Sequence, residues 1–246
     1  RIRGEVRFDR VSRMLYATDA SNYQIDPVGV VIPRSVDDVI GAVELAASHS
    51  VPVLPRGGGS SLAGQTVGAA LVIDTSKYLN KVLNVNPEEK TVTVEPGINL
   101  DALNRQMKQH GLMFGPDPSS ANRATVGGVV GNNAAGAHSI LYGMTADHIV
   151  NARVQLANGG TVDLGPGTME EHVQRATQND PTGRLLKSLL AFREEHSELI
   201  RRDSPPHWRR ATGYSLNQFL TEDDAFNPAR LMAASEGTLG TTLSLT

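Results

Sequence analysis

A glycine-rich segment at residues 55–65 limits the fold of this chain more than any other feature of its sequence. It lies between the apolar segments 51–55 and 70–74, each of which predicts a short buried strand. The three glycines at 57–59 permit positive φ angles and let several backbone N–H groups point at one place. A flexible surface loop is the alternative, but a disordered loop is rarely held between two buried strands. We therefore interpret the segment as an ordered binding loop.

The same loop carries groups that suit an anion. Ser60 and Ser61 supply hydroxyl donors and Arg56 supplies a positive charge, so we predict that the loop binds a phosphate or pyrophosphate. The nucleotide triphosphatase pattern is not met, because Gln65 stands where its lysine is required. The G-x-G-x-x-G dinucleotide pattern is not met either, because it would need a glycine at Leu62. The loop therefore belongs to neither standard nucleotide motif.

The order of strands and helices predicts an α/β-like unit and then a second unit that begins near Leu79. The predicted strands are 29–33, 51–55, 70–74, 82–85, 91–95, 149–157, 161–164, 231–234 and 241–245. The predicted helices are 36–49 behind the N-cap Ser35, a helix from Asn99 to Gly111, and 182–200 within a helical insertion at about 166–230. We expect one domain over 1–246, with subdomains at about 1–78 and 79–246.

Composition excludes several classes of protein. With 23 Lys and Arg against 26 Asp and Glu, the net charge of −3 argues against a dedicated nucleic-acid binder. The absence of cysteine excludes disulfides and thiolate-held metals or iron–sulfur clusters within these 246 residues. No apolar run approaches the roughly 20 residues that a membrane helix needs. Because the chain starts at Arg1 and stops within an alternating apolar run, we interpret it as a fragment of a longer protein.

Three further clusters of small residues follow, at 115–120, 124–136 and 235–240. In the cluster at 124–136, which is the third of the four, Thr125 can cap a short helix whose glycines would let a flat or charged ligand approach closely. The pair Asn132–Asn133 can donate and accept hydrogen bonds, as is needed to bind the edge of a heterocycle. Tight packing of a helix on a sheet, without any ligand, is the alternative for this cluster.

In this order, the four clusters and the pair Tyr142-Gly143 resemble a known family of flavoproteins. The family is that of vanillyl-alcohol oxidase and p-cresol methylhydroxylase, and the resemblance is to its FAD-binding domain. Within the family, the sequence is most similar to the FAD-linked D-2-hydroxyacid dehydrogenases: glycolate oxidase D subunit, D-lactate dehydrogenase and D-2-hydroxyglutarate dehydrogenase. The segments 4–10 and 16–23 also resemble the large members that fuse this module to an iron–sulfur region.

The resemblance implies an α+β, α/β-like fold in which FAD lies between two subdomains. It also implies that loop residues from all four clusters contact the cofactor. These expected cofactor-binding residues are Pro55, Arg56, Gly57, Gly58, Gly59, Ser60, Ser61, Gly64, Gln65, Pro116, Asp117, Pro118, Ser119, Thr125, Gly127, Gly128, Gly131, Asn132, Asn133, Gly136, Tyr142, Gly143, Glu236 and Gly237.

Some relatives bind FAD covalently through a histidine, and Ser60 occupies that position here, so we expect non-covalent FAD. His138 follows the third cluster and is a candidate to approach the flavin, with an ordinary surface histidine as the alternative. The resemblance places the catalytic histidine and a divalent-metal site beyond residue 246. The histidines of this chain show no metal-ligand spacing, so no metal is expected within it.

The substrate candidates are Arg209 and Arg210, because a segment similar to theirs contacts the substrate carboxylate in the family, and a guanidinium fork suits a carboxylate. Ordinary surface arginines are the alternative. Ala211 departs from the family, which usually has asparagine at this position.

We therefore expect the FAD-binding module of an oxidoreductase that oxidises a D-2-hydroxy acid by hydride transfer to FAD. The fragment alone is expected to be catalytically incomplete. The expected partners are a small 2-hydroxy acid and an electron acceptor that the sequence does not name, with any iron–sulfur cluster in the remainder of the parent protein. We expect that protein to be cytoplasmic or peripherally associated with a membrane. The alternatives are an alkyl-glycerone-phosphate-synthase-like transferase and a packing or interaction domain that binds no flavin.

Overall fold

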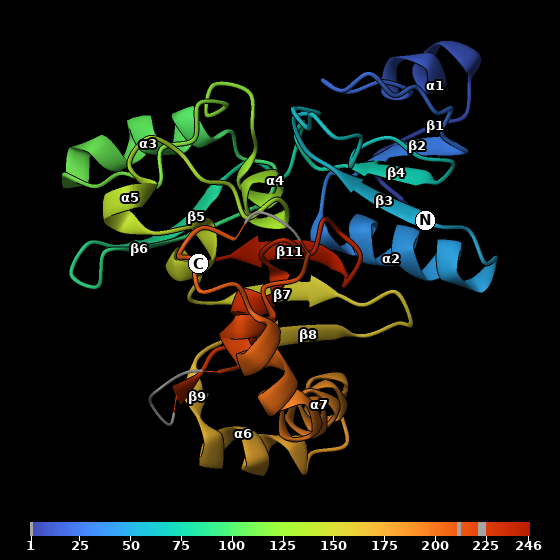
Figure 1. Cartoon of the computed structure of the whole chain (residues 1–246). Helices are drawn as coiled ribbons and strands as arrows, with labels where there is room; N and C mark the ends of the chain where they lie inside the picture. The colour runs from blue at the N-terminus through green and yellow to red at the C-terminus, as the bar shows by residue number, and fades with distance from the viewer. Residues whose placement is uncertain (1, 211–212, 221–224) are drawn as a thin grey trace.

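The computed structural model describes residues 2–210, 213–220 and 225–246, and Figure 1 shows its two main sheets. The first sheet has the strand order β1-β2-β4-β3, in which β2, β4 and β3 are parallel and β1 is an antiparallel edge. Its strands are β1 (Glu5–Arg7), β2 (Gly29–Ile32), β3 (Val53–Arg56) and β4 (Leu71–Asp74).

Helix α2 (Val36–Ser48) covers one face of the first sheet. It begins as predicted, because the Ser35 hydroxyl accepts a hydrogen bond of 3.2 Å from the backbone N–H of Asp38. Its apolar side packs Val39 and Val43 against Ile73 of β4. The short strand β1 and helix α1 (Arg10–Tyr16) were not predicted, because three and seven residues of mixed polarity show no clear period.

The second sheet is antiparallel throughout, with the order β5-β6-β11-β7-β8. Both predicted hairpins are present, and the last strand of the chain lies between them. Its strands are β5 (Val82–Asn86), β6 (Thr91–Val94), β7 (Ala152–Gln155), β8 (Thr161–Leu164) and β11 (Thr241–Leu245). Together with the parallel first sheet and its helices, this sheet confirms the α+β class expected from the sequence.

Short helices lie on the second sheet and carry several of the predicted site residues (Figure 1). Asn99 caps α3 through a 3.1 Å hydrogen bond from the Ala102 N–H to its side chain, and Gly111 ends this helical region at φ 69°. The elements are α3 (Leu100–Met107), the 3-10 helix η1 (Lys108–His110), α4 (Val126–Gly131), α5 (Ser139–Tyr142) and the 3-10 helix η2 (Thr145–His148).

The expected strand at 231–234 is wrong. The structure has a 3-10 helix there, η4 (Pro228–Met232). Pro228 occupies its first turn, and the Asn227 side chain accepts a 3.0 Å hydrogen bond from the Ala229 N–H. An apolar run of this length is compatible with a strand or a buried helical turn, and the proline and its cap decide in favour of the turn.

The segment expected as a helical insertion also contains a small two-stranded sheet. The long helix begins at Pro181, one residue earlier than predicted, because the side chain of its N-cap Asp180 accepts a 2.8 Å hydrogen bond from the Gly183 N–H. The elements are β9 (Gly167–Thr168), α6 (Met169–Ala176), α7 (Pro181–Asp203), η3 (Leu216–Phe219) and β10 (Ala225–Phe226). Within the described ranges, no helix is long and apolar enough to cross a membrane.

One side chain joins the two sheets. Leu243 of β11 is 1% exposed and packs in the core cluster that α2 and the first sheet form, together with Val39 and Ile73. A backbone hydrogen bond of 2.8 Å from the Gly97 N–H to the Leu79 carbonyl adds a second link. The loops that follow the strands of both sheets are thereby held close together.

Candidate cofactor-binding site

The first and third glycine clusters meet in the structure. A Cβ atom on Gly57 would lie 1.9 Å from the Thr125 hydroxyl, and one on Gly58 would lie 2.1 Å from the carbonyl oxygen of Arg123. Both distances are too short for any side chain, so the chain passes here only because these residues are glycines. The predicted loops 56–61 and 124–136, far apart in the sequence, are therefore in direct contact.

A cavity of about 540 Å³ opens at this contact, and we call it the junction cavity. Gly58, Arg123 and Thr125 line it together with residues of the loops before α3 and after β4. The complete lining is Gly58, Ser76, Asn80, Gly97, Ile98, Asn99, Ala102, Asn122, Arg123 and Thr125. The junction cavity has the polar and small residues that a phosphate-bearing ligand requires.

Thr125 contributes a buried hydroxyl without a partner. The residue is 3% exposed, and its Oγ1 accepts and donates no hydrogen bond within the described part of the chain. Thr125 is the N-cap of α4 as predicted, but its side chain makes no capping bond. The backbone N–H groups of Val126 and Gly127 donate instead to the carbonyls of Ile98 and Pro96, at 2.9 and 2.8 Å. A buried hydroxyl left unpaired is costly, which favours a ligand that would pair it.

Arg56, which was expected to supply positive charge to the ligand, is hydrogen-bonded to backbone carbonyls of the protein. Its guanidinium donates to the backbone carbonyls of Tyr16 and Thr66 at 3.2 and 2.9 Å, and to that of Thr18 at 2.8 Å. Burial lowers the pKa of Arg56, although the carboxylates of Asp74 and Asp19 act in the opposite direction. The arginine thus anchors the loop after β3 to the segment after α1.

The second and third clusters also meet. A Cβ on Gly136 would lie 1.9 Å from the Asp117 carbonyl, and the Ala137 N–H donates to the same oxygen at 3.2 Å. Asp117 has φ 50°, a left-handed conformation that aspartate tolerates better than most residues. Its carboxylate lies 3.5 Å from Nδ1 of His138, and both side chains are about half exposed.

A further cavity of about 590 Å³ lies beside this contact, and we call it the Trp208 cavity. Arg209 lines it, so the structure brings one of the two substrate candidates next to predicted cofactor residues. Its lining is Asp101, Asp117, Pro118, Ser119, Ala121, Asn122, Ala135, Gly136, Ala137, Trp208 and Arg209. Arg210 is not part of this lining, and its Nε donates to the Pro205 carbonyl at 3.1 Å. The expectation about Ala211 lies outside the described residues.

The fourth cluster completes the arrangement. The Gln65 side-chain amide donates to Oε1 of Glu236 at 3.1 Å, and the Glu236 N–H donates to the Gly131 carbonyl at 2.9 Å. A Cβ on Gly237, whose φ is 81°, would lie 3.1 Å from the ring of Pro55. The turn after η4 therefore touches both the first and the third cluster.

Other predicted residues have structural partners of their own. Asn133 is buried, with φ 48°, and its Oδ1 accepts a 2.9 Å hydrogen bond from the Ala146 N–H. Gly64, at φ 82°, packs against the ring of Tyr23, and Gly143, at φ 83°, ends α5 beside Asp147. These positions shape the loops, and they show that part of the glycine pattern serves packing.

Ser61 is partly buried, and its Oγ accepts a 3.2 Å hydrogen bond from the Gln65 N–H. Several other predicted residues lie exposed on the loops. Those classed as exposed are Gly58, Ser119, Gly128, Asn132, Tyr142 and Glu236. Asn122, Arg123 and Trp208 also line these cavities, although the sequence motifs did not predict this. Their positions in the sequence could have indicated this role. Asn122 and Arg123 lie between the clusters 115–120 and 124–136, and Trp208 precedes Arg209.

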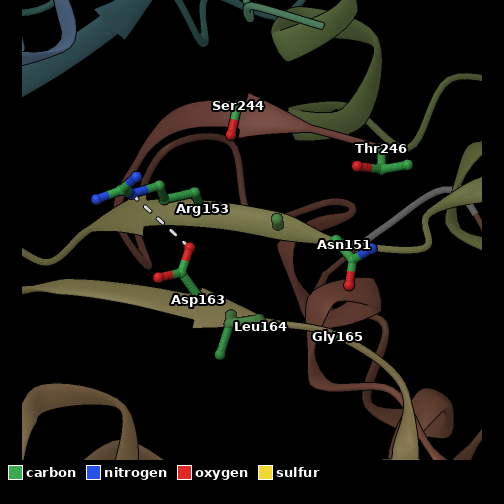
Figure 2. A pocket seen from close by; sticks show the side chains of 8 residues that line it. Asn151, Arg153, Asp163, Leu164, Gly165, Ser244 and Thr246 are labelled. Carbon is green, nitrogen blue, oxygen red and sulfur yellow. Dashed lines mark ion pairs between the residues drawn. The ribbon is translucent and has the colours of Figure 1, made fainter. Parts of the chain in front are cut away.

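A smaller cavity of about 240 Å³ lies on the outer strands of the second sheet, and none of the predicted residues lines it. Figure 2 shows the ion pair of Arg153 in β7 and Asp163 in β8, together with Ser244 of β11 and Thr246, which follows β11. The Arg153 Nε and the Asp163 Oδ1 lie 3.7 Å apart, and both side chains are exposed. Its charges therefore pair with each other. In the described ranges, no group of three or more His, Asp or Glu side chains is placed to hold a metal ion.

The fold and the four converging glycine-rich loops are typical of proteins that bind a dinucleotide cofactor. Residues 27–165 match the family described as the FAD binding domain. The chain therefore belongs to this family of FAD-binding domains, and FAD is its cofactor.

The relatives agree with this membership. D-2-hydroxyglutarate dehydrogenases of Pantoea ananatis (strain AJ13355) and Escherichia coli (strain K12) are 36% and 35% identical over 240 residues, which is 96% of this chain and 24% of each relative. Glycolate oxidase subunit GlcD of Bacillus subtilis (strain 168) is 36% identical over 172 residues, which is 67% of this chain and 36% of that protein. The chain spans about a quarter of the length of the dehydrogenases it matches.

A solved structure of alkyldihydroxyacetonephosphate synthase shows the same fold. The match covers 98% of this chain and 35% of the synthase chain, with a TM-score of 0.65 and 22% sequence identity. At that identity the likeness concerns the fold alone. The FAD-binding fold expected from the sequence is thereby confirmed, as is the resemblance to the FAD-linked D-2-hydroxyacid dehydrogenases.

Proposed function

We propose that FAD binds non-covalently where the four loops meet, with its diphosphate in the junction cavity. The observation that supports this best is the buried Thr125 hydroxyl, which has no hydrogen-bond partner among the residues that the structure describes. It lies against Gly57 at the wall of that cavity. The residues fit the cofactor, because a backbone without Cβ atoms admits a phosphate closely and the hydroxyl can donate to it. We also propose that the two sheets correspond to subdomains at about 1–78 and 79–246.

The test of this binding is a visible absorption spectrum of the purified chain, followed by thermal unfolding with and without added FAD. Bound FAD should give a yellow protein, and added FAD should raise the unfolding temperature because it binds only the folded state. Acid precipitation should release the colour into the supernatant, since Ser60 offers no covalent link. A colourless chain whose unfolding temperature is insensitive to FAD would contradict the proposal and favour a packing or interaction domain.

For the longer protein, we propose the oxidation of a D-2-hydroxy acid. The three relatives named above carry names of D-2-hydroxyglutarate dehydrogenases or of a glycolate oxidase subunit. FAD, when bound, supplies the acceptor for the hydride from the substrate carbon. Electrons would then pass to an acceptor outside these residues, for which we propose an iron–sulfur region of the longer protein.

Arg209 is our candidate for holding the substrate carboxylate, because it lines the Trp208 cavity beside Asp117 and Ser119. A guanidinium binds a carboxylate through two parallel hydrogen bonds, which also orients the substrate. In the longer enzyme, Arg209→Gln should raise KM for the hydroxy acid by about 10-fold or more, the effect of losing a charge-assisted hydrogen bond. Arg210→Gln is the matched control, because Arg210 donates to the Pro205 carbonyl. Equal kinetics for both variants would contradict this role.

A transferase with the same fold would use the cofactor without net oxidation of its substrate. The fold likeness does not separate the two reactions, whereas the relatives that are 35–36% identical are named as oxidoreductases. Anaerobic addition of a D-2-hydroxy acid to the longer protein should bleach the yellow colour if the protein is a dehydrogenase. Retention of colour with every hydroxy acid tried would favour the transferase.

A further inference from the structure

The arginine that the sequence assigned to the proposed site is held by other parts of the protein. The diphosphate of a dinucleotide carries two negative charges, and oriented N–H groups are commonly supplemented by a guanidinium or an ammonium. Arg56, the arginine of the first loop, already donates to the carbonyls of Tyr16, Thr18 and Thr66. Its donors at Nη1 and Nη2 are therefore engaged within the protein, so a guanidinium that contacts the phosphates would have to come from another arginine.

Arg123 has the position for this role. It is an exposed residue that lines the junction cavity together with Gly58 and Thr125. No hydrogen bond or ion pair of its side chain occurs among the described residues, whereas Arg153 and Arg175 pair with Asp163 and Asp180. Arg123 therefore brings a free guanidinium to the cavity that already holds an unpaired buried hydroxyl.

Hydrogen bonds and close packing fix the backbone of Arg123. Its N–H donates to the Ser120 carbonyl at 2.8 Å, and the next N–H, of Ala124, donates to the same oxygen at 2.8 Å. Its own carbonyl lies against Gly58, where a Cβ would come within 2.1 Å. Only the side chain would have to be ordered on binding, which keeps the entropic cost of binding low.

We propose that Arg123 is the counter-charge for the diphosphate of the cofactor, acting beside the Thr125 hydroxyl and the Gly58 backbone in the junction cavity. The inference rests on the proposed function, since it concerns the same site. It assigns a ligand role to a residue that lies between the motifs 116–120 and 124–136 and belongs to neither. The guanidinium fork can bind two phosphate oxygens at once, which a single hydroxyl cannot.

The test compares three ligands on four proteins: the chain of 246 residues, Arg123→Gln, Arg123→Lys and the control Arg153→Gln. FAD carries the diphosphate and the flavin, ADP carries the diphosphate without the flavin, and riboflavin carries the flavin without phosphate. Affinities are measured by titration calorimetry at low and high salt. Unfolding without ligand is recorded for each variant. Arg123→Gln should unfold like the parent chain, because the Arg123 side chain is exposed and has no hydrogen-bond or ion-pair partner among the described residues.

Arg123→Gln should weaken both FAD and ADP by about 10- to 100-fold, the factor that accompanies loss of a charge-assisted hydrogen bond. Riboflavin affinity should not change, and the salt dependence of FAD binding should decrease. Arg123→Lys should lie between, and Arg153→Gln should match the parent. Two outcomes would overturn the role of Arg123 and leave the proposed function standing. In the first, the parent chain binds FAD and Arg123→Gln binds it with the same affinity. In the second, Arg123→Gln weakens riboflavin binding by the same factor as FAD binding. If the parent chain binds no FAD, the proposed function falls and the inference with it.

Discussion

The side-chain amide of Gln65 lies 3.1 Å from Oε1 of Glu236 and links the first glycine-rich loop to the last, across 171 positions of the sequence. The Glu236 N–H also donates to the Gly131 carbonyl at 2.9 Å, so Glu236 connects three of the four clusters. The site therefore depends on contacts between loops of both sheets, and neither sheet supplies it alone.

Replacing this amide by a carboxylate should open the site. Gln65→Glu would place two negative charges where one hydrogen bond now lies, and like charges at this distance repel. We expect FAD to dissociate several-fold faster, as measured by flavin fluorescence after dilution. Gln106→Glu on the exposed side of α3 is the control with the same charge change. An unchanged dissociation rate for Gln65→Glu would show that the two loops are not held together through this contact.

Gly57→Ala should disrupt the contact between the loops. The new methyl group would lie 1.9 Å from the Thr125 hydroxyl, so the backbone or the threonine must move. We expect a loss of about 1–3 kcal/mol in the free energy of unfolding, together with weaker FAD binding. Gly41→Ala in α2 is the control, because nothing lies within 4 Å of its Cβ, and it should gain about 0.5–1 kcal/mol. The measurement is chemical denaturation.

The double variant Gly57→Ala, Thr125→Ala distinguishes a clash from a general weakness of the loop. Removing the hydroxyl and the methyl group of Thr125 makes room for the alanine at position 57, so part of the lost stability should return. If the double variant were less stable than either single variant, the contact between these two residues would not explain the effect of Gly57→Ala.

Thr125→Val should affect stability and binding in opposite directions. The variant keeps the shape of the side chain but removes a buried hydroxyl that has no partner. The protein without ligand should be as stable as the parent or gain about 1 kcal/mol, because an unsatisfied buried group costs about 1–3 kcal/mol. FAD affinity should fall about 10-fold. Denaturation without FAD and a FAD titration measure the two effects, and a large loss of stability without FAD would contradict this account.

Stability at acid pH should depend on Glu5. The carboxylate accepts hydrogen bonds from the Lys77 ammonium and the Tyr78 hydroxyl at 2.6 and 2.7 Å, and it also pairs with Arg7. These bonds lower the pKa of Glu5 from 4.5 to about 2. Because the unfolded chain binds the proton more readily, this contribution is present above pH 4.5 and is lost as the pH falls toward 2.

Glu5→Gln tests this directly, since glutamine does not titrate. The parent chain should lose stability more steeply than Glu5→Gln between these two pH values, as followed by denaturation at several pH values and low salt. High salt should reduce the difference, because the carboxylate is exposed to solvent screening. Parallel curves for the two proteins would show that the ion pair does not contribute to folding.

Local patterns predicted most of the regular structure. Ser35 and Asn99 cap their helices as expected, and the hairpin predicted across 158–160 forms, with Gln155 paired to Thr161. Elements set by longer-range packing were less predictable. Residues 231–234 have the apolar character of a strand, yet Pro228 and the Asn227 side chain hold them in a 3-10 turn beneath the second sheet.

The sequence by itself determined that a glycine-rich loop follows a buried strand. Three consecutive glycines and the apolar segments on either side are local features that predict this without knowledge of the fold. It also carried the motifs of the FAD-binding family. Only the tertiary structure decided which charge faces the cavity. Arg56 donates to the carbonyl of Tyr16, 40 residues earlier, whereas Arg123 lines the junction cavity and its side chain has no hydrogen-bond partner in the part of the chain that the structure describes. A side chain's availability depends on its neighbours in space, and those neighbours are set by how the two sheets pack.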